Sequence, residues 1–185
     1  MGRSKRSGQD GVSLLEVLVV LALAITFQAV AAPAMGKLTD SFRLTASANS
    51  LFTGLQLARS EAIARNSRVV LCKSPAGDQC VSTGGWHEGW IVFNDVNNNA
   101  SRDPGEEMLF REQPSSSPLR LTGNSTVANY VSYTGLGMAR HTSGAFQAGT
   151  FTVCVPSAAP SEARQLVLSN TGRVRTTRLT VSHCG

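Results

Sequence analysis

The chain has 185 residues, of which 17 are lysine or arginine and 12 are aspartate or glutamate, so its formal net charge is +5. This length leaves room for a long helix and one compact domain, and a mildly basic balance is by itself weak support for nucleic-acid binding. No HExxH, GxSxG, GxxxxGKS or GxGxxG motif is present and the histidines are scattered, so we expect neither an enzyme nor a bound cofactor.

The N-terminal segment combines a basic leader with a long apolar run. Residues 1–11 carry three basic side chains and end at Gly11, and residues 12–32 are apolar except for a few polar positions that include Glu16. A helix of that length spans roughly 30 Å, the thickness of a membrane core. A carboxylate there costs on the order of 2 to 3 kcal/mol at the centre, which indicates a function for Glu16. We predict a transmembrane helix over residues 12–32, with the leader in the cytoplasm.

This order of leader, glycine, Val-Ser-Leu-Leu-Glu and apolar helix resembles the class III signal of type IV pilins and type II secretion pseudopilins. The resemblance implies that a prepilin peptidase cleaves after Gly11 and methylates the new amine on Val12. It also implies that Glu16 pairs with the free amine of a neighbouring subunit during assembly, and a buried charge is tolerated when it is paired. Phe is usual at the position of Val12, and this departure bears on processing efficiency.

Two other readings of the N-terminal segment are open. One is a secretory signal peptide cut after Ala31 or Ala34, but the apolar run exceeds the usual 7 to 15 residues of such a signal. In that case Glu16 would also lie inside the hydrophobic region. The other is a plain single-span anchor, which gives no reason for Gly11 or Glu16.

The helical pattern continues past the apolar run, with a kink expected at Pro33. Apolar positions at helical spacing on one face are Leu51, Leu55, Ala58 and Ala62. We therefore predict one helix over residues 12–66. Its first half would form the membrane or filament core, and its amphipathic second half would pack on a globular domain.

Short β-rich runs separated by Gly, Pro and Asn occupy residues 67–185. The predicted strands are residues 69–72, 89–93, 108–111, 119–121, 130–133, 150–155, 165–168 and 173–181. The fold class is therefore α+β, in which a long N-terminal helix packs on an antiparallel β-sheet domain, as in type IV pilins.

Cys72, Cys80, Cys154 and Cys184 all follow the apolar segment, where the chain should face the periplasm or the exterior and disulfides persist. Four cysteines allow three connectivities, and proximity favours Cys72–Cys80 and Cys154–Cys184. A zinc site is the competing reading, but no CxxC or Cys/His pair at metal spacing is present.

The segment from Asp95 to Glu106 places oxygen ligands at the spacing of an EF-hand calcium loop. Ala100 stands where glycine is expected, Arg102 lies among the candidate ligands, and strands rather than helices flank the segment. We therefore predict a structural hairpin tip held by Asx turns, with calcium binding as the alternative and no metal site assigned.

Residues in the middle of the chain narrow the resemblance to one group of pseudopilins. Residues 57–63 lead to the run 69–72, and Gly89-Trp90-Ile91-Val92-Phe93 is followed by Asp95, Asn97, Asp103, Gly105 and Glu106. This block resembles the GspH/FimT group of minor pseudopilins, and the resemblance runs over nearly the whole chain.

The C-terminal segment concentrates positive charge. In Gly172-Arg173-Val174-Arg175, strand alternation puts Arg173 and Arg175 on one face, whereas Arg178 joins them only if the strand ends or bulges near Thr177. This GRxR pattern resembles the DNA-binding element of FimT-type minor pilins, which act in DNA uptake during natural transformation. The resemblance implies that Arg173 and Arg175 contact the DNA backbone, with Arg178 as a third contact. Because the sequence suggests no groove-reading helix, we expect no base specificity. The alternative is a basic strand that keeps a sheet edge soluble.

Together these features predict a minor pilin of a type IV pilus whose partners are DNA, other pilin subunits, prepilin peptidase and the inner membrane. We expect a single-pass inner-membrane protein with a periplasmic C-terminal domain, exposed at the cell surface once assembled. One alternative is a structural tip or priming pseudopilin, of a type II secretion system or a pilus, that binds no DNA. Another is an adhesin-like tip in which Trp86 and Trp90 form a ligand surface, although buried strand aromatics are the more ordinary use.

Overall fold

The computed structural model describes residues 12–157 and 159–184, without the side chains of residues 29–34 and 37. The chain divides into two units, Met1–Thr39 and Asp40–Gly185. Helix α1 (Leu14–Arg65) contributes to both of them. The predicted leader, residues 1–11, lies outside the described residues.

In the N-terminal unit, the described part of α1 is an apolar helix with exposed side chains, among them Leu14, Leu18 and Phe27. Ser13 precedes the helix, and its Oγ accepts a hydrogen bond of 3.2 Å from the backbone N–H of Glu16, as an N-cap does. Among the residues that the structure describes, no helix combines the length and the apolar character needed to cross a membrane.

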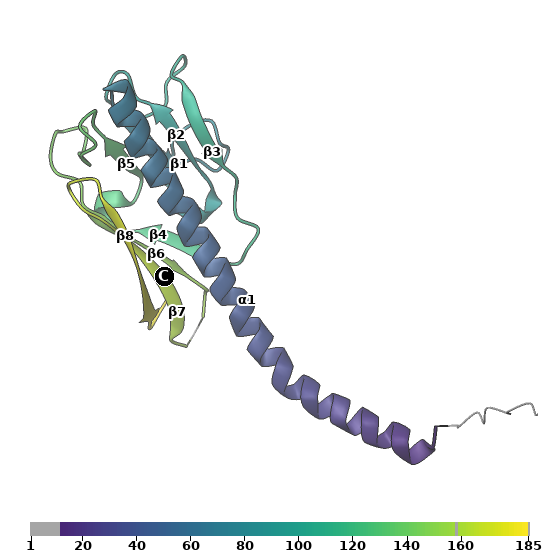
Figure 1. Ribbon diagram of the computed structural model, residues 1–185. Helices are drawn as coiled ribbons and strands as arrows, with labels where there is room; N and C mark the ends of the chain where they lie inside the picture. Colours follow the sequence, from purple (N-terminus) through teal and green to yellow (C-terminus); the bar gives the residue numbers. More distant parts are fainter. Residues whose placement is uncertain (1–11, 158, 185) are drawn as a thin grey trace, which may run out of the picture. The chain divides into compact units, whose positions relative to one another are not determined.

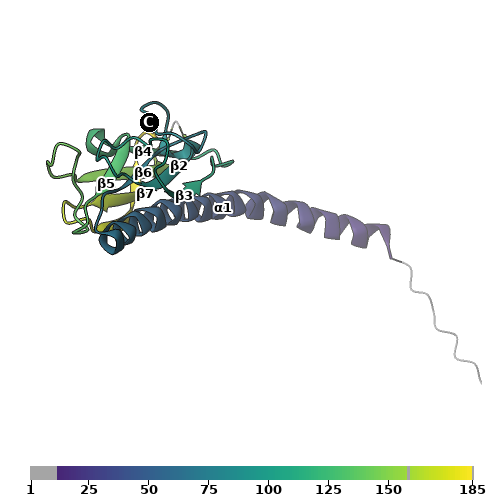
Figure 2. The same cartoon turned by 90° about the horizontal axis from the view of Figure 1, so that it is seen from above.

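In the second unit, α1 presents one apolar face to the strands. The buried residues of that face recur every three or four positions: Leu44, Ala48, Leu51, Leu55, Ala58 and Ala62. All the strands lie on one side of this part of α1 (Figures 1 and 2). The helix ends because Asn66 adopts a left-handed φ of 49°, and the N–H groups of Asn66 and Ser67 bond to the carbonyls of Ile63 and Ala62. This is the pairing of a Schellman motif.

The first sheet, sheet A, contains β1 (Val69–Lys73), β2 (Trp90–Asn94), β3 (Met108–Glu112) and β5 (Tyr130–Tyr133) in the order β3-β2-β1-β5. All its pairs are antiparallel. Both of its faces are buried over most of the inner strands β1 and β2. One face joins the core under α1 through residues such as Leu71 and Val92, and the other forms a second apolar cluster around Val70 and Phe93.

The second sheet, sheet B, contains β4 (Arg120–Gly123), β6 (Gly149–Cys154), β7 (Ser161–Leu168) and β8 (Val174–Val181) in the order β4-β6-β7-β8. Its inner face adds Leu121, Phe151, Val153, Leu166 and Leu168 to the core under α1. Its outer face carries polar or partly exposed side chains such as Thr152 and Gln165. Two short 3-10 helices, η1 (Trp86–Glu88) and η2 (Ser125–Val127), lie in the connections.

The predicted α+β architecture is confirmed, with a helix packed on antiparallel sheet. The main difference lies in β7, which begins at Ser161 and not at the predicted Gln165. Its polar first half has no strand-like hydrophobic pattern. It is a strand because residues 161–164 pair with β8 and the buried Arg164 contacts α1.

Candidate functional site

Arg173 immediately precedes β8 and Arg175 is its second residue, just past the tight turn that connects β7 to β8. The turn closes through hydrogen bonds from the Gly172 N–H to the Ser169 carbonyl and from the Ser169 N–H to the Arg173 carbonyl, both 2.9 Å. Gly172 has a φ of +80°, which favours glycine. Both arginine side chains are exposed.

Helix α1 fixes the position of this turn. The Arg59 guanidinium donates to the carbonyl of Gly137 at 3.0 Å and to that of Thr171 at 3.4 Å. The turn packs so closely against the neighbouring loop that a Cβ on Gly172 would lie 2.1 Å from the Gly137 carbonyl oxygen. Two contacts distant in sequence therefore hold the segment that presents Arg173, and sequence reasoning missed the role of Arg59.

The strand register separates the three predicted arginines. Arg175 pairs with Val167 on the outer face of sheet B, whereas Arg178 pairs with Arg164 on the inner face. The pairing of β7 with β8 is continuous from Ser161 to Leu168, so no bulge brings Arg178 round to the outer face. The structure therefore brings Arg173 and Arg175 together and leaves Arg178 apart.

Arg173 and Arg175 line one depression of about 460 Å³, together with Val167, Ser169 and Val174. Within the described residues, neither guanidinium forms an ion pair or a hydrogen bond. A guanidinium fork matches the geometry of phosphate or carboxylate oxygens, so this surface can bind an anion.

The residues predicted for processing and assembly lie at the other end of the chain. Gly11 is outside the described residues, whereas Val12 and Glu16 are exposed. Glu16 stands in the first turn of α1, where a carboxylate also interacts favourably with the helix dipole. The Ser-x-x-Glu spacing of Ser13 and Glu16 is the sequence signal of a helix N-terminus, which sequence reasoning did not use.

Both disulfides favoured by proximity are present, Cys72–Cys80 and Cys154–Cys184. The first joins β1 to the loop that follows it. The second ties the segment after β8 to the end of β6, so it closes the C-terminal end of sheet B.

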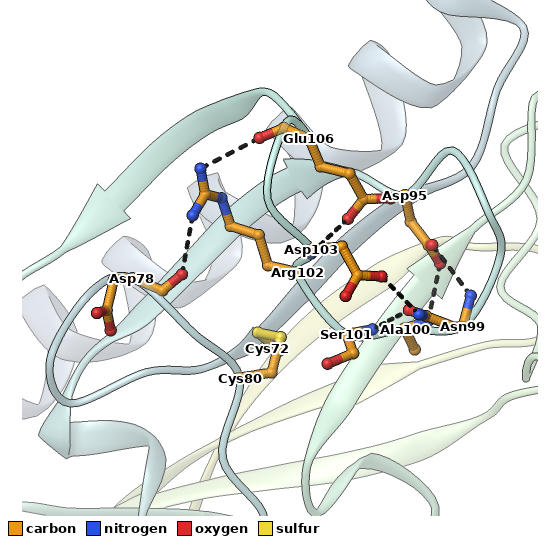
Figure 3. Close-up of a disulfide and its surroundings, with 10 residues drawn as sticks. All are labelled: Cys72, Asp78, Cys80, Asp95, Asn99, Ala100, Ser101, Arg102, Asp103 and Glu106. Carbon is orange, nitrogen blue, oxygen red and sulfur yellow. Dashed lines mark hydrogen bonds between the residues drawn. A yellow bond between two sulfur atoms is a disulfide. The ribbon is translucent and has the colours of Figure 1, made fainter.

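The loop that resembled a calcium site satisfies its own carboxylates (Figure 3). Asp95 accepts hydrogen bonds from the backbone N–H groups of Asn99 and Ala100, each at 3.0 Å. Glu106 accepts from the N–H groups of Val96 and Asp103 at 2.8 and 3.0 Å. Backbone donors therefore occupy the oxygens that a cation would need.

Other polar side chains of the loop also form hydrogen bonds within the protein. The side-chain amides of Asn97 and Asn99 donate to Asp103 and lower the pKa of its carboxyl, whereas burial raises the pKa of Asp95. Arg102 bonds to the carbonyls of Asp78 and Glu106, beside the Cys72–Cys80 disulfide (Figure 3). Among the described residues, no group of three acidic, His or Cys side chains is arranged to hold a metal.

The two tryptophans belong to the core. Trp86 and Trp90 are 1% and 2% exposed, and the Trp86 indole N–H donates to the Val127 carbonyl at 3.1 Å. The Trp90 ring packs directly against Gly54 of α1. A Cβ at that position would lie 2.2 Å from the ring. Both rings are buried, so Trp86 and Trp90 do not form the exposed ligand surface that the adhesin-like alternative requires.

Comparisons with known proteins address the fold and the family. A crystal structure of the type IV minor pilin FimU from Pseudomonas aeruginosa is similar over 80% of this chain and 99% of the FimU chain, with a TM-score of 0.58 and 19% identity. A second crystal form of FimU matches 77% of this chain and 100% of its own, with a TM-score of 0.55 and 20% identity. No curated protein matches the chain.

The family described as "Type II transport protein GspH" matches residues 47–172, which is more than half of the chain. The match includes the C-terminal part of α1, both cysteines of the Cys72–Cys80 disulfide and the strands up to the turn after β7. The chain therefore belongs to the GspH family, and its fold is similar to that of the minor pilin FimU.

Proposed function

We propose that this protein is a minor pilin of a type IV pilus that binds extracellular DNA through Arg173 and Arg175 for uptake in natural transformation. The observation that carries the proposal is the pair of exposed guanidinium groups beside a turn that Arg59 fixes. Neither has an ion-pair partner among the described residues. A pair of exposed cations beside a fixed turn at a sheet edge suits phosphate binding.

Such binding would be weak, dependent on salt and insensitive to sequence. Two phosphate contacts correspond to a slope of about −1.8 when the logarithm of the binding constant is plotted against that of the salt concentration. In the described part of the unit Asp40–Gly185, α1 packs on the sheets. No helix in this part projects from the domain to enter a DNA groove. Arg178, on the inner face, would add a contact only where DNA passes around the edge of β8.

The N-terminal part of the proposal concerns processing and assembly. Cleavage by prepilin peptidase after Gly11 would expose the amine of Val12 for methylation, and Glu16 would pair with such an amine on a neighbouring subunit. Before assembly the protein would be held in the inner membrane by residues 12–32 as a single pass, with its β domain in the periplasm. The exposed apolar side chains of α1 support burial against lipid or other subunits.

The test is DNA binding by the full chain in nonionic detergent, measured by fluorescence anisotropy across a salt series. We expect Arg173→Gln/Arg175→Gln to abolish salt-dependent binding. The matched control is Arg120→Gln, compared with Arg175→Gln, because Arg120 is also exposed but lies on β4, the opposite edge of sheet B. Equal loss in Arg120→Gln would point to net charge rather than a site, and no binding by the wild-type chain at low salt would reject the proposal.

The end of the family match favours a second candidate. The match stops at residue 172, immediately before Arg173, so the arginines are not part of what identifies the family. A structural tip or priming pseudopilin that binds no DNA is therefore the alternative, with the arginines contacting a neighbouring subunit. In that case Arg173→Gln/Arg175→Gln would remove assembled filaments from a sheared-surface fraction, whereas the DNA proposal predicts normal filaments and lost uptake.

A further inference from the structure

A narrow cleft lies on the inner side of sheet B, between α1 and the last two strands. Its volume is about 200 Å³, and its lining includes Thr45, Asn49, Arg164, Thr176 and Arg178. This volume is below the roughly 300 Å³ at which ordinary small-molecule pockets begin, so the cleft suits a small ion.

Arg164 forms a fixed, buried wall of this cleft. One terminal nitrogen donates to Glu162 Oε1 at 2.7 Å, and the other donates to the hydroxyls of Ser41 and Thr45 at 3.0 and 3.3 Å. The Nε–H has no hydrogen bond within the described part of the chain. The guanidinium is thus held in place with one donor still free.

Arg178 faces the same cleft from the neighbouring strand. It pairs directly with Arg164 in the β7–β8 register, is exposed, and has no ion pair among residues 12–157 and 159–184. Like charges directly opposite each other on paired strands are destabilising. Glu162 neutralises only one of the two charges, so one uncompensated positive charge remains beside the hydroxyls of Thr45 and Thr176.

We propose that this cleft binds one tetrahedral oxyanion, such as phosphate or sulfate, between the guanidinium groups of Arg164 and Arg178. Charge-assisted hydrogen bonds from the two arginines would offset the cross-strand repulsion. The site goes beyond the proposed DNA contacts and does not depend on them, because Arg175 lies on the opposite face of the sheet. The bound anion would also join the edge strand β8 to the wall that Arg164 forms with α1.

The experiment is a titration of the full chain in nonionic detergent with inorganic phosphate, followed by NMR of the arginine Nε–Hε signals. Sodium chloride keeps the ionic strength constant, because free salt screens exposed charges. We expect saturable shifts of the Arg164 and Arg178 signals with a Kd of about 1 mM, typical of weak binding. No saturable shift by about 10 mM, ten times that Kd, would overturn the proposal.

Matched variants separate the cleft from general charge. Arg178→Gln should weaken phosphate binding about tenfold or more, and Arg178→Lys should retain part of it, because lysine keeps the charge but not the fork. Arg120→Gln removes one exposed arginine from the same sheet, on the opposite edge strand β4, and should leave the affinity unchanged. Wild-type affinity in Arg178→Gln, with a preserved spectrum, would refute the site.

Measuring duplex DNA binding by the same variants identifies the source of the oxyanion. If Arg178→Gln loses phosphate binding but keeps the wild-type affinity for duplex DNA, the cleft binds a free oxyanion. If both affinities fall together, the cleft receives a phosphate of the DNA backbone. Loss of DNA binding in Arg173→Gln/Arg175→Gln, with phosphate binding intact, would keep the two sites distinct. Failure of the DNA proposal would leave the phosphate titration unaffected.

Discussion

The two sheets of this protein differ in how many of their faces are covered by other parts of the chain. Sheet A is covered on both faces, by α1 on one and by loops on the other, and its strand β1 is buried at every position. Sheet B is covered by α1 on its inner face, while its outer face and the edge strand β8 carry exposed side chains. A sheet with one open face keeps its packing and still presents a surface to a partner, and the residues proposed to bind DNA lie on sheet B.

The packing of this loop on sheet A also explains why the loop has the oxygen spacing of a ligand site. The loop from Asp95 to Glu106 must hold its backbone over the apolar cluster around Phe93, and its carboxylates accept the backbone N–H groups to do so. Buried polar groups have to be satisfied, and this loop satisfies them internally. The oxygen-rich spacing therefore reflects the folding of the cover.

The largest expected effect on stability tests whether sheet A is buried on both faces and sheet B on one. Phe93→Ala should lower the free energy of unfolding by about 3–5 kcal/mol, because Phe93 is fully buried on the loop-covered face of sheet A. Val167→Ala, on the outer face of sheet B, should lower it by about 1 kcal/mol or less, since that side chain is only half-buried. Urea denaturation measures both. Similar losses would mean that the outer face of sheet B is also covered in solution.

Removing each disulfide compares the two sheets a second time. Cys154→Ala/Cys184→Ala should lower the free energy of unfolding by about 3.7 kcal/mol and Cys72→Ala/Cys80→Ala by about 2.6 kcal/mol, from the loop lengths in the chain-entropy model. The difference arises because the separations are 30 and 8 residues. Urea denaturation of the oxidised protein gives the values. The reverse order would show that the cover of sheet A depends on its disulfide beyond loop closure.

Gly172→Ala should have a smaller effect on stability and a direct effect on the proposed DNA contacts. The left-handed φ costs a Cβ-bearing residue about 1–2 kcal/mol, and contact with the Gly137 carbonyl would displace the turn before Arg173. Gly144→Ala is the control, because Gly144 has a φ of +85° but open space around it. Thermal melting and DNA anisotropy should therefore separate the two variants. Equal DNA affinity in both would show that the turn does not position the arginines.

The smallest effect is a pH dependence within the cover of sheet A. Burial raises the pKa of Asp95, so the folded protein holds this proton at pH values where the unfolded chain, with a pKa of about 3.9, has lost it. The contribution of Asp95 to stability therefore falls as the pH rises from about 4 through the raised pKa. Relative to Asp95→Asn, the wild type should lose stability over that window and show a constant difference above it. A constant difference from pH 3 to about 7 would contradict the raised pKa.

Much of the fold could be predicted from the sequence because local patterns specify it. The heptad-like spacing from Leu44 to Ala62 indicates the buried face of α1, and the alternation of residues 150–154 indicates β6. The first half of β7 could not be predicted in this way. Its buried Arg164 donates hydrogen bonds to Ser41 and Thr45, which lie more than a hundred residues earlier in the chain.

The candidate site was predictable in its residues and not in its arrangement. Arg173 and Arg175 share a parity that the sequence displays, but the position of Arg178 depends on whether β8 continues without a bulge. The role of Arg59 depends on the approach of two loops to the end of α1, which no local pattern reports. Register and loop packing are properties of the whole unit, so they became visible only in the structure.

Strand β8 is held at both of its ends. At one end the turn is bonded to Arg59 of α1, and at the other Cys184 is joined covalently to Cys154 of β6. A pulling force applied at Arg175 therefore cannot unzip the strand from a free end, one hydrogen bond after another. The load is shared at once between α1 and β6, which is the mechanical arrangement that the proposed role of carrying DNA would require.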